Sequence, residues 1–154
     1  MASAEDHAHV RFLRLALKEA AKCTPVPTAF CVGCVIVDPA GTGPHIVATG
    51  YSRELPGNTH AEANALANLP KHAGHYGLDM YTTLEPCSVR TSGLQPCAEG
   101  IVQSGKVKRV FVGVGEPDDF VNCEGAKYLQ EHGVEVIWVK DLERECLMEA
   151  RRGR

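Results

Sequence analysis

The sequence predicts a single α/β domain over residues 1–154, in which a mixed five-stranded sheet is covered by helices on both faces. A chain of 154 residues fits one compact domain. Hydrophobic residues make up 44% and charged residues 23% of the chain, an ordinary globular composition with enough apolar surface for one core. The apolar periodicity changes from helix to hairpin and then to alternating strands and helices, an order typical of three-layer α/β/α folds.

The first half of the chain is predicted to form a helix, a hairpin and a second helix. Apolar side chains recur at helical spacing over Asp6–Lys22, which predicts the first helix. Phe30–Val37 is a short, valine-rich run that suits a strand buried on both faces. The turn residues of Asp38–Pro44 separate it from a strand over Ile46–Tyr51, so these two strands are expected to pair. Ala61–Leu69 then carries alanine and leucine at helical spacing.

The second half is predicted to alternate strands with helices. The expected strands are Leu78–Leu84, Val107–Val114 and Val134–Val139, and the expected helices are Ala98–Ser104, Cys123–His132 and Leu142–Arg151. Ligands of such sheets bind at the carboxyl ends of strands, where the following helices begin. The functional residues are therefore expected at these junctions.

The charge and the apolar pattern exclude several classes of protein. The net charge is -3 at pH 7, and no basic field dominates, which argues against tight nonspecific binding to nucleic acid. The longest apolar run, Ala29–Val37, is far shorter than the roughly 20 residues that cross a membrane. Glu5, Asp6 and His7 stand where a signal peptide would have a basic region. We therefore expect a cytoplasmic protein that does not bind membranes.

Seven cysteines are many for this length, and the number is odd. Without a signal peptide, a metal site plus buried thiols accounts for them better than a disulfide framework does. Cys31, Cys34 and Cys146 fall within apolar patterns and are expected in the core.

The chemistry-bearing residues lie in three short segments at the predicted junctions. These segments are Thr59–Glu62, Leu84–Cys87 and Gln95–Cys97. Catalytic zinc takes three nitrogen or sulfur ligands and keeps a fourth position for water, and His60, Cys87 and Cys97 supply such a set. Glu62, two residues beyond His60, can face that water and move protons. The order His-x-Glu, Pro-Cys and a later Cys is the signature of zinc deaminases, so we expect one Zn²⁺ per subunit.

Two other interpretations remain open at this point. A noncatalytic zinc module that binds a partner would normally recruit a fourth cysteine or histidine, and none is obvious nearby. A cytosine, cytidine or nucleic-acid deaminase would share the zinc chemistry, although aromatic residues make up only 6% of the chain and an RNA-binding surface would need more. Zinc content and ammonia release from a panel of pyrimidines would discriminate among them.

With these motifs, the chain resembles the cytidine deaminase superfamily and, within it, the pyrimidine deaminases of riboflavin biosynthesis. The resemblance runs from Cys31–Val37 to the helix after Cys97. Gly50–Glu62 and Met80–Cys87 are especially similar to the yeast and fungal branch. Nine residues, Ser88–Pro96, separate the two cysteines, whereas transfer-RNA adenosine deaminases and simple cytidine deaminases have two residues there.

The resemblance implies a cytidine-deaminase-like fold and a specific reaction. The substrate would be 2,5-diamino-6-(ribitylamino)pyrimidin-4(3H)-one 5′-phosphate, and the products 5-amino-6-(ribitylamino)uracil 5′-phosphate and ammonia. In the fungal order of steps the sugar is reduced before deamination. Relatives commonly form dimers, so a homodimer is expected as well.

Substrate contacts follow less directly from the motifs. The expected contacts are Ser52, Arg53, Asn58, Ala61, Glu85 and Arg90. Asn58 lies directly before the zinc histidine segment, and Arg90, between the two cysteines, suits a phosphate because guanidinium groups bind phosphate through paired hydrogen bonds. Ala29–Gly33 departs from the bacterial Pro-Asn-Pro pattern, so the asparagine contact of bacterial relatives does not carry over.

Two further features remain open in the sequence. His72 and His75 are candidates for the rim of the pocket. The last helix has an apolar stripe that suits either a subunit interface or packing on its own sheet; it consists of Leu142, Cys146, Leu147 and Ala150.

Overall fold

The computed structural model describes residues 3–40, 43–71, 76–88, 90, 94–115 and 124–153. Its strands are β1 (Gly33–Asp38), β2 (His45–Tyr51), β3 (Leu78–Leu84), β4 (Val107–Val114) and β5 (Glu135–Trp138). Its helices are α1 (Ala4–Ala20), α2 (Ala61–Ala67), α3 (Cys97–Ser104), α4 (Glu124–Glu131) and α5 (Glu143–Ala150), with a 3-10 turn η1 (Lys140–Leu142) before α5. Within the described residues, no helix is long and apolar enough to cross a membrane.

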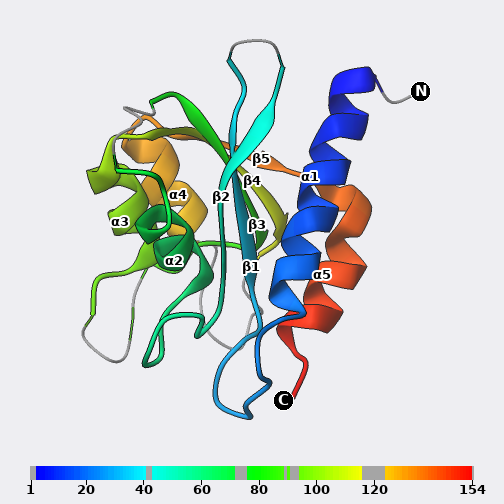
Figure 1. Cartoon of the computed structure of the whole chain (residues 1–154), viewed down its shortest axis with the longest axis vertical. Helices are drawn as coiled ribbons and strands as arrows, with labels where there is room; N and C mark the ends of the chain where they lie inside the picture. The colour runs from blue at the N-terminus through cyan, green and yellow to red at the C-terminus, as the bar shows by residue number, and fades with distance from the viewer. Residues whose placement is uncertain are drawn as a thin grey trace.

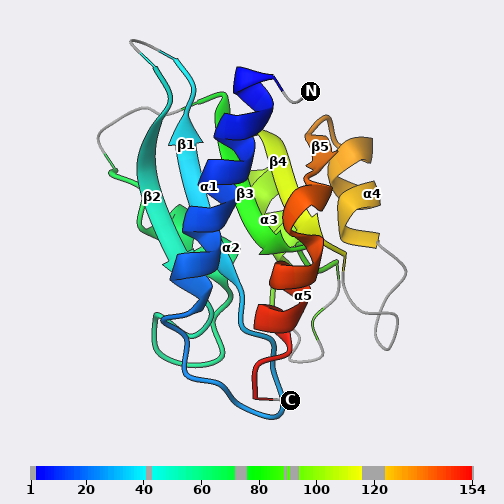
Figure 2. The same cartoon turned by 90° about the vertical axis from the view of Figure 1, so that its right-hand side faces the viewer.

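The sheet is the middle one of three layers, as the sequence predicts. The strands lie in the order β2-β1-β3-β4-β5. Helices α1 and α5 cover one face, and α2, α3 and α4 cover the other (Figures 1 and 2). The predicted mixed five-stranded sheet and its helical layers are therefore confirmed.

The strand directions decide where the functional site lies. β1 pairs antiparallel with both β2 and β3, while β3, β4 and β5 run parallel. The carboxyl ends of β2, β3 and β4 therefore meet at one edge of the sheet. The chain leaves β2 there toward α2 and leaves β3 there toward α3, so both segments that follow these strands are brought to the same place.

Glycines let two helices lie close against the sheet. A Cβ at Gly50, in β2, would lie 2.5 Å from both the Ala61 carbonyl oxygen and the Ala65 nitrogen of α2. A Cβ at Gly33, in β1, would overlap the Ala16 carbonyl oxygen of α1. Without these side chains the helix backbones rest directly on the strands, because hydrogen is the only substituent that fits.

The last helix packs on its own sheet. Leu142, Cys146 and Ala150 are all fully buried, and α5 lies over β3 and β4. The apolar stripe predicted from the sequence is therefore used inside the molecule, and the buried part of it is not free for a subunit interface.

The first strand begins later than the sequence predicts. Phe30–Val37 is the predicted strand, but β1 starts at Gly33. The backbone N–H of Cys31 donates to the Ala150 carbonyl over 3.0 Å, and that of Val32 donates to the Ser52 hydroxyl oxygen over 2.9 Å. The apolar run continues, but its first residues bond to the chain end and to the loop after β2 instead of to a strand.

Candidate metal centre and active site

The three predicted metal ligands come together at the carboxyl edge of the sheet. The ligand atoms of His60, Cys87 and Cys97 all lie within 4.8 Å of one another, the one such cluster among the described residues. Nδ1 of His60 lies 3.6 Å from Cys87 Sγ and 3.3 Å from Cys97 Sγ. One imidazole and two thiols form a set that fits catalytic zinc, which keeps a fourth position open.

The histidine is positioned by the loop between β2 and α2. His60 lies directly before α2 and is half-buried. Asn64, buried one turn later, donates from Nδ2 to the Tyr51 carbonyl over 2.9 Å and to the Thr59 hydroxyl over 3.0 Å. Arg53 N–H donates to the Thr59 carbonyl over 2.7 Å. These bonds hold the loop to the helix, so the imidazole direction follows from the position of α2.

The two cysteines come from different local structures. Cys97 is the first residue of α3, directly after the N-cap residue Pro96. Cys87 lies in the irregular segment after β3, and residues 85–88 hold no helix. Helix α3 reaches back to hold it: the Ala98 N–H donates to the Cys87 carbonyl over 3.0 Å.

The two thiols share their protons unequally. A hydrogen bond with the Cys97 thiol lowers the pKa of Cys87 to about 4. Burial acts in the opposite direction, and a hydrogen bond with His60 lowers this pKa further. The backbone N–H of Cys97 also donates to Cys87 Sγ over 3.3 Å. The pKa of Cys97 lies well above its usual range because its proton is shared with Cys87 and because it is buried. The two sulfurs therefore lie close enough to share a proton, and each would bind a metal as its thiolate.

Glu62 lies beside this cluster in the first turn of α2. Its side chain is 4% exposed, and burial, which penalises the charged form, raises the pKa of the carboxyl. The Thr82 hydroxyl oxygen, fully buried in β3, lies 3.2 Å from Glu62 Oε1. Thr82 is absent from the predicted site; its signal in the sequence is a pair of threonines in an otherwise largely apolar strand.

A hydrogen bond joins two of the predicted substrate contacts. Arg90 Nη2 donates to the carbonyl oxygen of Asn58 over 2.7 Å, which joins the loop between the cysteines to the residue two before His60. Asn58 is exposed and Arg90 is half-buried. The guanidinium keeps further N–H donors beyond this one bond.

Two other predicted substrate contacts, Ser52 and Arg53, form hydrogen bonds to other parts of the protein. Ser52 is buried, and its backbone N–H donates to the Val32 carbonyl over 3.0 Å. The Arg53 guanidinium donates to the carbonyls of Phe30 over 3.3 Å and Thr24 over 3.0 Å, and Arg53 has a left-handed backbone with φ of 62°. Both residues brace the segment before β1, which corresponds to the part of the sequence that departs from the bacterial pattern.

The last two predicted contacts are buried. Ala61 is fully buried between His60 and Glu62. Glu85 is 3% exposed, and its Oε2 accepts a hydrogen bond from the backbone N–H of Ala126 over 2.8 Å. The predicted rim residues His72 and His75 lie outside the described residues.

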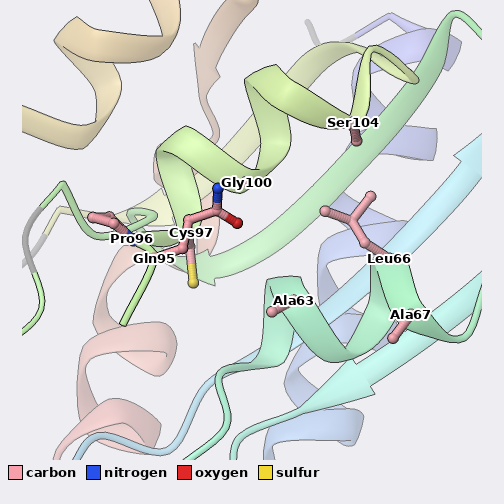
Figure 3. A pocket seen from close by; sticks show the side chains of 8 residues that line it. All are labelled: Ala63, Leu66, Ala67, Gln95, Pro96, Cys97, Gly100 and Ser104. Carbon is pink, nitrogen blue, oxygen red and sulfur yellow. The ribbon is translucent and has the colours of Figure 1, made fainter. Parts of the chain in front are cut away.

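A groove next to the metal cluster runs between α2 and α3 (Figure 3). Its volume is about 320 Å³. The Cys97 side chain points from the start of α3 toward α2 in this view. The groove is lined mainly by small side chains, and its lining consists of Ala63, Leu66, Ala67, Gln95, Pro96, Cys97, Gly100 and Ser104.

The chain is similar to known deaminases in sequence. Residues 6–114 match the family model of the cytidine and deoxycytidylate deaminase zinc-binding region. The diaminohydroxyphosphoribosylamino-pyrimidine deaminase of Schizosaccharomyces pombe is 45% identical over 94% of this chain and 35% of its own length. Riboflavin biosynthesis protein RibD of Actinobacillus pleuropneumoniae is 38% identical over 69% of this chain and 26% of its own length. The chain thus spans about a quarter to a third of these curated relatives.

The chain is also similar to deaminases of known structure. The Rib2 deaminase of Aspergillus oryzae, a C-terminal deletion mutant, matches with a TM-score of 0.84 and 35% identity over 95% of this chain and 92% of that chain. The same deaminase in complex with DARIPP matches with a TM-score of 0.84 and 35% identity over 95% and 91% of the two chains. This protein therefore belongs to the cytidine and deoxycytidylate deaminase family, whose members carry a zinc-binding region.

Proposed function

We propose that this protein is a zinc-dependent hydrolase that deaminates 2,5-diamino-6-(ribitylamino)pyrimidin-4(3H)-one 5′-phosphate in riboflavin biosynthesis. The products are 5-amino-6-(ribitylamino)uracil 5′-phosphate and ammonia. The observation that carries the proposal is the buried Glu62 carboxyl beside the cluster of His60, Cys87 and Cys97. The fungal Rib2 deaminase, at 35% identity over nearly the whole chain, supports the substrate class.

The cluster suits hydrolytic deamination. His60, Cys87 and Cys97 would hold zinc, which when bound activates water at neutral pH. Glu62 is the proton carrier: the carboxylate takes the two protons of the attacking water in turn, giving the first to the ring nitrogen beside the amino-bearing carbon and the second to the departing amine. Burial of Glu62 supports this role, since a carboxyl with a raised pKa holds its proton nearer to neutral pH. Water replaces the amino group, and ammonia leaves.

We assign the sugar phosphate to the mouth of the site. Asn58 and Arg90 lie together there, and the remaining guanidinium donors of Arg90 suit a phosphate group. Of the other expected contacts, Ser52 and Arg53 lie in the loop that leads to His60, and Ala61 is the first residue of α2. Ser52 and Arg53 would act on the substrate through the segment before β1, which both residues hold.

We also propose that the chain is a single deaminase domain that works in the cytoplasm as a homodimer. Free thiols such as Cys23 and Cys31, whose sulfurs lie 3.4 Å apart, suit a reducing compartment. Leu94, 58% exposed beside the start of α3, and the groove of small side chains between α2 and α3 suit a subunit contact. Sedimentation velocity of the wild type and of Leu94→Glu tests the dimer: the wild type should sediment as a dimer and the variant as a monomer.

The decisive assay measures ammonia release from the ribitylamino substrate and its ribosylamino counterpart, with cytidine and deoxycytidine beside them. Preference for the ribitylamino compound supports the proposal. Turnover of cytidine alone would favour a nucleoside deaminase. A zinc-loaded protein that releases ammonia from none of them would be a noncatalytic zinc module.

A further inference from the structure

We propose that the start of α4 clamps the segment that carries the metal ligand Cys87. The clamp consists of Glu85, Gly125 and Ala126. Glu85 then acts as a positioning residue for Cys87 rather than as a substrate contact. The proposal deepens the proposed function, because it assigns residues that hold the ligand set of the same site.

The first part of the clamp is a buried carboxylate bonded to a helix start. Glu85 accepts the backbone N–H of Ala126 over 2.8 Å, and its own N–H donates to the Val114 carbonyl over 2.9 Å. The first N–H groups of a helix have no partner within the helix, and the helix dipole favours a negative charge beside them. Glu85 is thus tied through its backbone to β4 and through its side chain to α4.

The second part of the clamp is a backbone contact that only glycine permits. A Cβ at Gly125 would overlap the carbonyl oxygen of Pro86. The first turn of α4 therefore rests directly on the peptide group that joins Pro86 to Cys87. Because Gly125 and Ala126 are adjacent, a single turn of α4 touches both residues that precede the ligand.

The clamp matters because Cys87 lies in irregular structure. On its far side, α3 holds Cys87 through the N–H groups of Cys97 and Ala98. On its near side, the chain is held by the clamp at Glu85 and Pro86. The sulfur position is therefore set by α3 and α4 together. Zinc binds thiolate sulfur at about 2.3 Å, so a shift of the segment that carries Cys87 weakens metal binding.

The test uses two variants of the full chain, Glu85→Ala and Gly125→Ala. Zinc affinity is measured by competition with a chelator, and Co²⁺ loaded in place of zinc gives a thiolate-to-metal absorption band that reports the geometry at sulfur. We expect both variants to bind zinc about 10- to 100-fold more weakly, as loss of residues that hold ligands usually does, and to alter the Co²⁺ band. Glu85→Gln should recover part of the affinity, because an amide oxygen still accepts the Ala126 N–H.

Two controls separate positioning from folding. Leu142→Ala removes a fully buried side chain outside the clamp, just before α5, so it should lower the melting temperature and leave zinc affinity and the Co²⁺ band unchanged. Glu124→Gln removes an exposed charge at the same helix start without touching Glu85 or Pro86, and should change neither quantity.

The outcomes distinguish this proposal from the proposed function. Wild-type zinc affinity and an unchanged Co²⁺ band in both clamp variants would overturn the clamp, whatever the activity. A raised KM of fully zinc-loaded Glu85→Ala with unchanged zinc affinity would make Glu85 a substrate contact instead. Absence of ammonia release from every pyrimidine would contradict the proposed function and leave the metal-binding measurements unaffected.

Discussion

The Thr82 hydroxyl oxygen lies 3.2 Å from Oε1 of Glu62 and 2.9 Å from the carbonyl oxygen of Leu84. A hydroxyl donates one hydrogen and accepts through two lone pairs. Thr82 can therefore donate to ionised Glu62, or accept from protonated Glu62 while it donates to Leu84. Because the hydroxyl can donate or accept, Glu62 keeps this hydrogen bond whether or not its carboxyl holds a proton.

Replacing Glu62 with glutamine should stop proton transfer while the side-chain volume is kept. We expect kcat of Glu62→Gln to fall by about 10²- to 10⁴-fold, the usual contribution of a general acid–base group. Zinc content should stay at the wild-type level, because glutamine removes no metal ligand. Ammonia release and metal analysis measure the two quantities. Glu99→Gln, in α3, serves as the matched control, and an active Glu62→Gln enzyme would refute the assigned role.

Removing either arginine near the site should weaken binding of the phosphorylated substrate. Arg90→Ala is expected to raise KM by about tenfold and to leave kcat nearly unchanged, since loss of one charge-assisted hydrogen bond costs about 1.5 kcal/mol or more. Arg53→Ala should raise KM too, and should lower the melting temperature because the guanidinium holds the Phe30 and Thr24 carbonyls. The dephosphorylated substrate is the control. Unchanged kinetics in both variants would remove the arginines from the site.

A methyl group at Gly50 should push α2 away from β2. Its Cβ would lie 2.5 Å from the Ala61 carbonyl oxygen, between His60 and Glu62 in sequence. We expect Gly50→Ala to lose about 1–3 kcal/mol of unfolding free energy and to lower kcat, because overpacking displaces the helix that carries the proton carrier.

The matched control is Gly100→Ala in α3. Its Cβ would meet only the flexible Gln95 side chain, at 3.3 Å. Alanine is the better helix former by roughly 0.5–1 kcal/mol, so this variant should be neutral or stabilised in urea unfolding. Equal effects of the two substitutions would contradict the close packing of α2 on β2.

Burial raises the pKa of the Cys146 thiol to about 12 from an ordinary value of 9.0. Below pH 9 the thiol is protonated in both states, so its contribution to stability is fully present. As pH rises from 9 to 12 only the unfolded thiol ionises, and the unfolding free energy falls, by about 1 kcal/mol at pH 10. Urea unfolding at pH 8 and pH 10 should show a smaller pH-dependent loss in Cys146→Ala than in the wild type. The same loss in both proteins would mean that another group titrates.

Local sequence predicts the inner strands and the ligands best. β3 and β4 begin and end at the predicted residues, because each is a largely apolar run flanked by glycine or proline residues that interrupt a strand. The cluster of His60, Cys87 and Cys97 is predictable because zinc chemistry restricts the residue types, and the strand order then brings the three side chains together. The three-layer arrangement follows from the alternation of the two periodicities.

Local sequence patterns do not predict structural features that depend on contacts between residues far apart in the chain. β1 begins later than predicted from Phe30–Val37 because the Cys31 N–H bonds to the carbonyl of Ala150, which lies far away in the sequence. Glu85 carries no local sign that it bonds the start of α4. The sequence pattern of the last helix also does not say what its apolar stripe packs against. Cys146 suits a subunit interface and a core equally well in the sequence, and only the structure shows that it is buried.

The strand order has a consequence for the maturation of the protein. β1 lies between β2, which leads to His60, and β3, which leads to Cys87. A chain that ends before β3 holds His60 but neither Cys87 nor Cys97, and the three side chains meet only when β3 has paired with β1. The complete metal cluster therefore exists only in a molecule in which the centre of the sheet has assembled.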